Sequence, residues 1–165
     1  MIIKSYEVEK KISNLLKFNF FLLYGENNGL KKDICKIIKK SIEKKEENLE
    51  TVSIYENEII EDEENFYNSI YSGSLFSDKK ILIVNNVTDK IVNQIQSVID
   101  KKPDNTILII TSDILEKKSK LRNLFEKDKE TICVPCYSDT SRDLAIIATN
   151  ELKKNNLLLS QEIIN

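Results

Sequence analysis

The sequence contains no histidine and no tryptophan among its 165 residues. Without histidine it cannot form a Ser-His-Asp triad, a Cys-His dyad or a metal site with a histidine ligand. The side chain that most often transfers protons near neutral pH is therefore missing. Carboxylates and lysines can still catalyse reactions, so this absence lowers the expectation of an enzyme without excluding one.

Glycine, proline and cysteine are scarce, with three, two and three residues. With so few glycines, the chain is poorly suited to form a glycine-rich loop that wraps nucleotide phosphates. The odd cysteine number argues against a small secreted scaffold held by disulfides. The N-terminus lacks the apolar core of a signal peptide, and the longest apolar runs, at 81–84 and 106–111, are too short to span a bilayer. We therefore expect a cytoplasmic protein with no membrane partner.

The residues that are present are typical of a folded, well-solvated protein. Hydrophobic residues make up 41% and charged residues 32%, enough for one domain, or for one domain and part of a second. The net charge is −2, whereas a protein that coats nucleic acid is basic. Lysine supplies 23 of the 25 basic residues, which indicates an AT-rich coding bias and weakens functional interpretations of lysine clusters.

Charge is unevenly distributed along the chain. Residues 31–45 hold seven lysines and two acidic residues, a net charge of +5, whereas residues 46–64 hold nine acidic residues and no basic one. A solvated helix face followed by a solvated loop explains this pattern. An electrostatic docking surface is the alternative.

Short apolar runs alternate with amphipathic helical patterns along most of the chain. The runs predict strands at 18–23, 51–55, 80–84, 106–111 and 131–134. This alternation predicts an α/β fold with three layers, in which helices cover both faces of a parallel sheet of about five strands. Only helical patterns follow residue 138. We therefore expect an N-terminal domain at 1–138 and the truncated beginning of a small helical domain at 139–165.

The turn after the first predicted strand stands where a nucleotide-binding domain carries its phosphate loop. A P-loop needs G-x-x-x-x-G-K-[ST], in which amides and lysine hold the phosphates and the hydroxyl holds Mg²⁺. Here Gly25 and Gly29 are one residue too close together, and Leu30 follows Gly29 directly. Lys31 and Lys32 bring no hydroxyl. We expect this degenerate segment not to bind nucleotide.

The acidic residue that an ATPase needs is also missing from its expected position. In a P-loop ATPase an apolar strand ends in a carboxylate that positions Mg²⁺ and water, but the run at 80–84 is followed by Asn85 and Asn86. These two losses fit a nucleotide-binding architecture that lacks its nucleotide chemistry. An α/β domain that never had a P-loop explains the residues equally well.

Cys133 and Cys136 have the spacing of half a zinc site or of a redox pair. Zinc needs two more ligands, and a thioredoxin-like pair would follow the first strand rather than the last. Two ordinary buried thiols are the favoured interpretation. The carboxylates at 56–64 are expected in a solvated loop rather than in a glycosidase-type pair. We therefore expect no catalytic residue, no metal and no cofactor.

A segment at 73–78, Gly-Ser-Leu-Phe-Ser-Asp, places two large apolar residues between small polar ones. A loop that exposes Leu75 and Phe76 is unfavourable unless the pair is buried locally or inserts into a partner. From the residues alone, local packing under the sheet edge is the favoured interpretation.

Four segments match a known family in order and spacing: FNFFLLYGENNGLKK (18–32), YSGSLFSDKKILIVNN (71–86), TILIITS with its charged helix (106–127) and VPCYSDTSRDLAIIA (134–148). Together they resemble the N-terminal part of the delta subunit of the bacterial DNA polymerase III clamp loader. The resemblance covers essentially the whole chain, although no single segment is as specific as a P-loop motif.

The resemblance implies an AAA+-like domain that does not hydrolyse ATP. In that family a Leu-Phe pair inserts into a hydrophobic pocket of the beta sliding clamp and helps to open the ring for loading onto primed DNA in replication. Leu75 and Phe76, with Ser74 beside them, match that pair. The resemblance also implies a non-catalytic component of the DNA polymerase III holoenzyme, a DNA-directed DNA polymerase and nucleotidyltransferase complex.

The resemblance further implies other clamp-loader subunits as partners. In the family a C-terminal collar joins them, and because the chain ends before such a collar, we expect a fragment. Contact with primer–template DNA is expected to be indirect or weak, because the net charge is close to zero.

Two other functions stay open. One is a nucleotide-binding, ATPase-type clamp-loader subunit, although such subunits carry a cysteine-rich zinc module that three scattered cysteines cannot supply. The other is an unrelated α/β protein-interaction domain, such as a receiver-like fold. A receiver needs acidic residues at its strand ends, whereas the runs at 80–84 and 106–111 are followed by Asn85 and Ser112.

Overall fold

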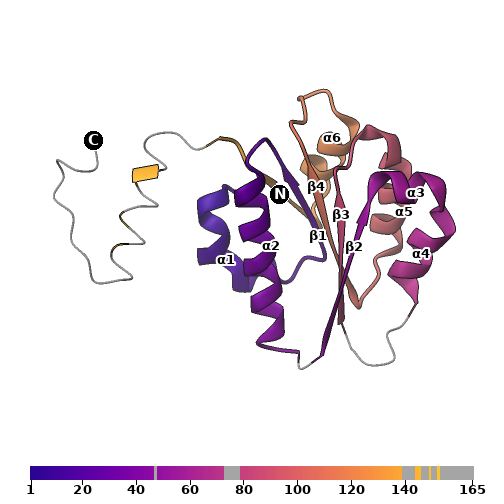
Figure 1. Cartoon of the computed structure of the whole chain (residues 1–165), viewed down its shortest axis with the longest axis horizontal. Helices are drawn as coiled ribbons and strands as arrows, with labels where there is room; N and C mark the ends of the chain where they lie inside the picture. Colours follow the sequence, from indigo (N-terminus) through magenta and orange to yellow (C-terminus); the bar gives the residue numbers. More distant parts are fainter. Residues whose placement is uncertain (47, 73–78, 139–143, 146–148, 150–151, 153–165) are drawn as a thin grey trace.

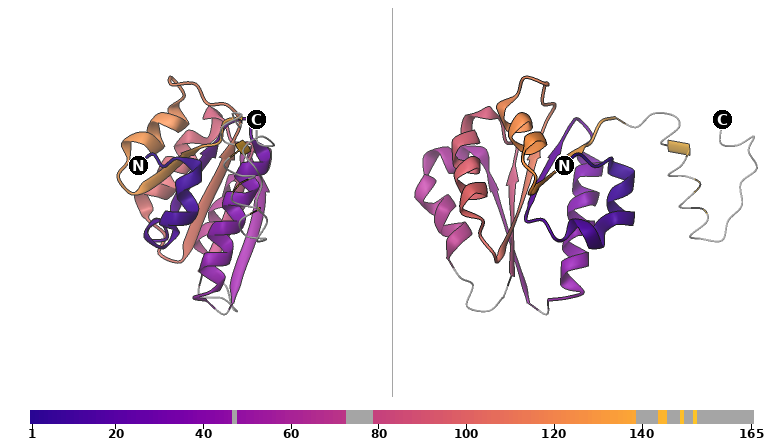
Figure 2. Two further views of the ribbon diagram at one scale, coloured as in Figure 1. Left: turned by 90° about the vertical axis from the view of Figure 1, so that its left-hand side faces the viewer. Right: turned by 180° about the vertical axis from the view of Figure 1, so that it is seen from behind.

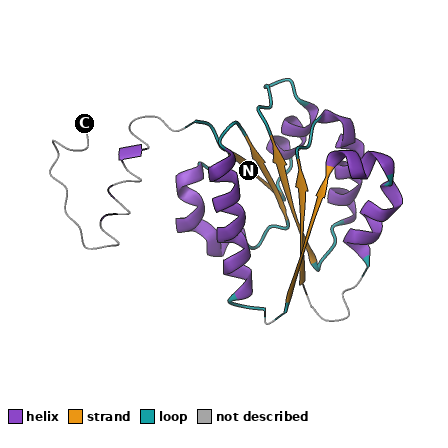
Figure 3. Ribbon diagram, in the orientation of Figure 1, coloured by secondary structure: helices purple, strands orange, loops and turns teal. Residues whose placement is uncertain are grey.

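The computed structural model describes residues 1–46, 48–72, 79–138, 144–145, 149 and 152. Within these residues a five-stranded parallel sheet lies between two layers of helices (Figure 1). Figure 3 shows the strands side by side in the centre and the helices on either side. The α/β fold predicted from the sequence is confirmed.

All five predicted strands are present, within a few residues of their expected bounds. They are β1 (Phe20–Tyr24), β2 (Leu49–Tyr55), β3 (Lys79–Asn85), β4 (Thr106–Ser112) and β5 (Thr131–Pro135). The helices are α1 (Val8–Leu15), α2 (Asn28–Glu43), α3 (Glu56–Glu61), α4 (Glu63–Tyr71), α5 (Val92–Lys101) and α6 (Lys120–Lys127). Two short 3-10 turns, η1 (Ser5–Glu7) and η2 (Asp89–Ile91), precede α1 and α5.

The strand order is β2-β3-β4-β1-β5, so β1 lies between β4 and β5. The chain leaves β1 through α2 and crosses to the far edge at β2, and it leaves β4 through α6 on the opposite face to reach β5 (Figure 1). The carboxyl ends of β1 and β4 therefore meet at a topological switch point, where open α/β sheets form their binding crevices.

The two faces of the sheet are buried in separate apolar cores. Phe21 of β1 and Ile38 of α2 belong to the core on the side of α1 and α2. Leu22 of β1 and Phe125 of α6 belong to the core on the side of α3 to α6. Since β1 is central and buried along its whole length, its sequence is a continuous apolar run rather than an alternating one.

The carboxylates at 56–64 do not lie in the solvated loop that the sequence predicted. After β2, which was expected, these residues form all of α3 and the start of α4, and Ile59 of α3 is buried in the core. Acidic residues fill the first turns of both helices, where they interact favourably with the positive end of the helix dipole. With only six residues, α3 is too short for a clear apolar stripe, which explains the wrong prediction.

The helices expected from residue 139 onward fall almost entirely outside the described residues. The division at 138/139 therefore stays a prediction. No helix in the described part of the chain is both long and apolar enough to cross a membrane.

Candidate functional site

The candidate site lies at the switch point, in the loop that joins β1 to α2. Its backbone begins at Gly25, whose φ is +132°, a conformation that side-chain-bearing residues rarely adopt. A Cβ at Gly25 would lie 2.1 Å from the carbonyl oxygen of Cys136. Glycine is therefore required here for two reasons, the dihedral angle and the close approach of the chain after β5.

Lys31 is the buried cation of this site. Its Nζ donates hydrogen bonds to the carbonyl oxygens of Gly25 (2.7 Å) and Ser112 (2.8 Å) and lies 3.5 Å from Oδ1 of Asp113. Only 6% of the Lys31 side chain is exposed. The ammonium therefore links the first loop to the end of β4.

Lys31 occupies a position in the P-loop motif that the sequence analysis did not assign to it. Counted from Gly25, Lys31 stands at the lysine position of a P-loop, while Leu30 replaces the second glycine and Lys32 replaces the serine or threonine. Spacing counted from Gly29 concealed this match. Gly29 lies in the first turn of α2, and its missing Cβ would meet no atom closer than 3.5 Å. Lys32 is exposed on α2.

The backbone amides of the loop donate to protein acceptors. Gly25 N donates to the carbonyl oxygens of Asp113 (3.1 Å) and Ser112 (3.3 Å). Asn27 N donates to Cys136 O (3.0 Å), and Leu30 N donates to the side chain of Asn27, the N-cap of α2. A phosphate loop instead directs such amides at its anion.

The position of the missing carboxylate is held by two asparagines. Asn85 ends β3, and its Nδ2 donates to Ser53 Oγ (2.8 Å) and to the carbonyl oxygen of Ile54 (3.2 Å). Asn86 follows with φ of +57° in the left-handed region, which asparagine tolerates better than most residues. Asn85 therefore links neighbouring strands, and the strand end carries no charge that could hold Mg²⁺.

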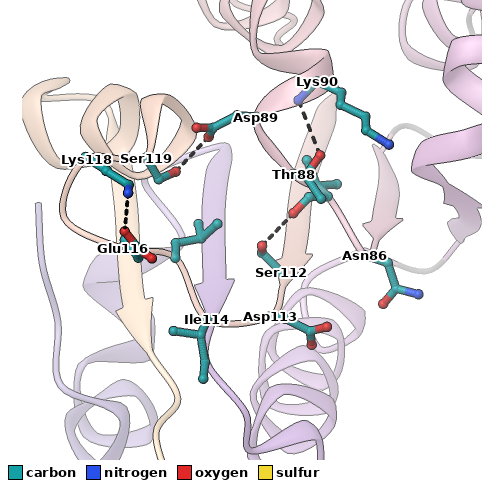
Figure 4. Close-up of a pocket in the computed structure, with 12 residues that line it drawn as sticks. Asn86, Thr88, Asp89, Lys90, Ser112, Asp113, Ile114, Glu116, Lys118 and Ser119 are labelled. Carbon is teal, nitrogen blue, oxygen red and sulfur yellow. Dashed lines mark hydrogen bonds and ion pairs between the residues drawn. The ribbon is translucent and has the colours of Figure 1, made fainter.

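A groove of about 550 Å³ opens beside this strand end, between residues 86–90 and 112–119 (Figure 4). Asp89 lies on its wall and accepts hydrogen bonds from Ser119 Oγ (2.7 Å), Lys120 N (2.9 Å) and Leu121 N (2.9 Å). Burial raises the pKa of Asp89, but these hydrogen bonds outweigh it and lower the pKa below the usual 3.8. Because Asp89 occupies the N-terminal end of α6, that helix end is not open to a phosphate.

A second constellation holds the C-terminal end of α4, directly before residue 73. Lys80 Nζ donates to the carbonyl oxygens of Ser69 and Ser72, both at 3.0 Å, and 8% of its side chain is exposed. Thr106 Oγ1 donates to the carbonyl oxygen of Ile70 (2.9 Å). These hydrogen bonds satisfy carbonyl oxygens that would otherwise have no partner at the end of the helix. Ser74, Leu75 and Phe76 themselves lie outside the described residues.

Cys133 and Cys136 are free, buried thiols on opposite faces of the sheet. Burial raises the pKa of each to about 12, so both stay protonated at neutral pH. Because the two residues are three positions apart on an extended segment, their side chains lie on opposite faces of the sheet. Among the described residues no three Cys, Asp or Glu side chains gather as a metal-ligand set.

The model of one protein family, described as DNA polymerase III, delta subunit, matches residues 21–137. That segment contains both the loop at Gly25 and the α4 end before residue 73. The chain belongs to the DNA polymerase III delta subunit family. No curated protein matched the sequence of this delta-family chain.

Two solved structures resemble the delta-family chain. The clamp loader delta protein of Bacillus subtilis has 14% identity and a TM-score of 0.69, with 97% of this chain and 50% of that protein covered. A DNA replication initiation factor has 18% identity and a TM-score of 0.52, with 97% and 53% covered. At these identities the likeness establishes the fold. The chain spans about half the length of the structures that it matches.

Several residues of these sites were not expected from the sequence. Asp113 and Ser112 follow from the position of β4 next to β1, which a single sequence does not reveal. Lys80 is the second residue of β3 and Thr106 the first residue of β4, and both are polar residues at the start of an apolar strand. A charged or hydroxyl residue at the start of an otherwise apolar strand could have indicated that its side chain has a specific hydrogen-bonding role.

Proposed function

We propose that the chain is the clamp-binding part of a clamp-loader delta subunit, which binds the beta sliding clamp and helps to open it for loading onto primed DNA. It acts without binding or hydrolysing ATP and has no catalytic residue of its own. Family membership supports the clamp-loader role. The observation that carries the nucleotide-independent role is the use of the loop amides of Gly25, Asn27 and Leu30 by protein acceptors.

Two further features support a role without ATP. Lys32 replaces the hydroxyl residue that would hold Mg²⁺, and Asn85 replaces the carboxylate at the end of β3. The Lys31 ammonium is hydrogen-bonded to two carbonyl oxygens. A nucleotide would have to displace these bonds and bring its metal without a protein carboxylate at β3.

Leu75 and Phe76, flanked by Ser74, form the proposed contact with the clamp. The described chain stops at Ser72 and resumes at Lys79, and both ends are anchored, because Lys80 Nζ bonds Ser72 O. Anchored ends limit the freedom that a short segment loses on binding. Burying each apolar side chain in a partner contributes about 1.5–3 kcal/mol.

Assembly with the remaining clamp-loader subunits is proposed to depend on parts of the family's fold beyond the N-terminal domain. Residues 139–165 then begin the helical second domain, and a collar beyond it joins the other subunits of the polymerase III holoenzyme. The proposed site of action is the cytoplasm.

Surface plasmon resonance of the chain over immobilised beta clamp tests this function, with and without ATP·Mg²⁺. We expect saturable binding with the same Kd in both conditions. A parallel thermal-unfolding experiment should show no shift, whereas ATP at about 100 times its Kd would stabilise the protein by about 2.7 kcal/mol. Absence of clamp binding contradicts the proposal, and a large ATP-dependent shift identifies the chain as a nucleotide-binding subunit instead.

A further inference from the structure

We propose that the outward face of α2 binds the phosphate backbone of duplex DNA. This proposal goes beyond clamp binding and does not depend on it. The helix turns Ile34, Ile38 and Ile42 into the core. Its opposite face carries exposed or half-exposed lysines, and Figure 2 (left) views the molecule from this side. We define the α2 lysine row by Lys32, Lys36, Lys40 and Lys44.

Most of the row has no neutralising partner. Lys36 lies 3.4 Å from Asp33, and Lys39 beside the row lies 3.9 Å from Glu43. Lys32, Lys40 and Lys44 form no ion pair within the described part of the chain. Like charges four residues apart on a helix repel each other, and a polyanion laid along the row would remove that repulsion.

The geometry of the row suits a nucleic-acid strand. Four residues of helix advance about 6 Å, so the row from Lys32 to Lys44 extends about 18 Å. Each strand of a duplex carries one phosphate per 3.4 Å of the duplex axis, so a row of about 18 Å that lies along this axis spans about five phosphates of one strand. An extended row of separate charges matches a regular polyanion better than it matches one compact anion.

The row differs from the other exposed lysines in its regular spacing rather than in its lack of ion pairs. Lys102 pairs with Glu130 and Lys79 with Glu46, whereas Lys90, Lys117 and Lys127 also form no ion pair within the described residues. The acidic helices α3 and α4 lie on the opposite side of the sheet (Figure 1). The α2 lysine row therefore lies on the side of the sheet that faces away from these acidic helices.

Duplex DNA fits this face better than a membrane or an acidic protein does. The apolar stripe of α2, formed by Ile34, Ile38 and Ile42, is buried in the core, so the helix has no continuous apolar side to insert between lipids. An acidic peptide would have to adopt an extended conformation with evenly spaced carboxylates. A DNA duplex already presents its phosphates at regular spacing and needs no such ordering. Family membership links the chain to a DNA polymerase.

The test compares the chain with Lys32→Glu/Lys40→Glu/Lys44→Glu. A matched control, Lys90→Glu/Lys117→Glu/Lys127→Glu, makes the same charge change at exposed sites on the other side of the sheet. Fluorescence anisotropy with a labelled primer–template duplex gives the Kd at several salt concentrations. Three lost phosphate contacts should reduce the slope of log K against log salt by about 2.7. We expect the row variant to bind at least about tenfold more weakly at low salt and the control within about twofold of wild type.

Three outcomes would overturn the proposal. The first is unchanged DNA binding by the row variant, and the second is an equal loss in the control, which would mean that net charge alone matters. The third is binding of the wild-type chain to phosphatidylserine vesicles or to polyglutamate as tightly as to duplex DNA at the same salt concentration. Circular dichroism checks that each variant is folded, and retained clamp binding by the row variant separates this proposal from the proposed function.

Discussion

Lys31 Nζ lies 2.7 Å from the carbonyl oxygen of Gly25, the residue at which its own loop begins. The same ammonium bonds Ser112 on the neighbouring strand. A lysine at the P-loop position thus serves as an internal brace between two strand ends. The loop at the phosphate-loop position is held together by protein groups, namely this ammonium and the loop amides that donate to protein acceptors.

The first prediction concerns Lys31. Replacement of Lys31 by methionine should lower the free energy of unfolding by about 2–4 kcal/mol, because the buried carbonyl oxygens of Gly25 and Ser112 each lose a charged donor, and Ser112 O keeps only the longer bond from Gly25 N (3.3 Å). Lys32→Ala is the control and should change stability by less than about 0.5 kcal/mol, since Lys32 is exposed. Urea unfolding measures both. Equal, small effects would mean that Lys31 is not a structural brace.

The second prediction compares two glycines of one loop. Gly25→Ala should destabilise the fold by more than about 2 kcal/mol, because the methyl group meets Cys136 O and φ is positive. Gly29→Ala should be neutral or stabilising by up to about 1 kcal/mol, because Gly29 is helical and its surroundings are open. Similar unfolding midpoints for the two variants would contradict the described loop geometry.

The third prediction concerns Asp89 and pH. Asp89→Ala should cost about 1 kcal/mol at neutral pH, because α6 loses an acceptor for two of its first amides. The folded state lowers the Asp89 pKa, so it binds fewer protons there than the unfolded state does. This stabilisation is present above the usual pKa of 3.8 and is lost as pH falls through the lower folded pKa. Unfolding at several pH values should show the wild-type advantage disappearing in acid, and a pH-independent difference would contradict this origin.

The fourth prediction tests the anchor of the proposed clamp contact. Lys80→Met should weaken clamp binding and lower stability, because Ser69 O and Ser72 O lose their donor. The neighbouring Lys79→Ala is the control, since Lys79 is half-exposed and its ion pair within the described residues is with Glu46, and a surface pair contributes about 0–1 kcal/mol. Binding is compared at a temperature where both variants are fully folded. Unchanged clamp affinity of folded Lys80→Met would exclude a positioning role.

Local patterns predicted much of the fold. The five strands were visible because a parallel sheet with both faces covered leaves continuous apolar runs, as at Phe20–Tyr24. The strand order was not visible, because it depends on pairings such as Phe20 with Leu108 that lie far apart in sequence. Helix α3 was missed because it has only six residues, three of them charged, and so shows no clear helical periodicity.

The candidate site was predicted in position but not in geometry. The glycines marked the turn after β1, yet the sequence could not show that Lys31 turns inward to Gly25 and Ser112. Ser112 becomes a neighbour only through the pairing of β1 with β4. Leu75 and Phe76 remain predictions, as do their flanking residues in 73–78.

The most direct test of the central claim is the clamp affinity of Leu75→Ala/Phe76→Ala, measured by surface plasmon resonance. The matched control Ile60→Ala/Ile114→Ala removes two exposed apolar side chains elsewhere. Removing both side chains should cost about 3–6 kcal/mol of binding free energy from apolar burial. The double variant should therefore bind about 10² to 10⁴ times more weakly, with an unchanged unfolding midpoint. The control should bind as wild type does. Wild-type affinity of Leu75→Ala/Phe76→Ala for the clamp would contradict the account.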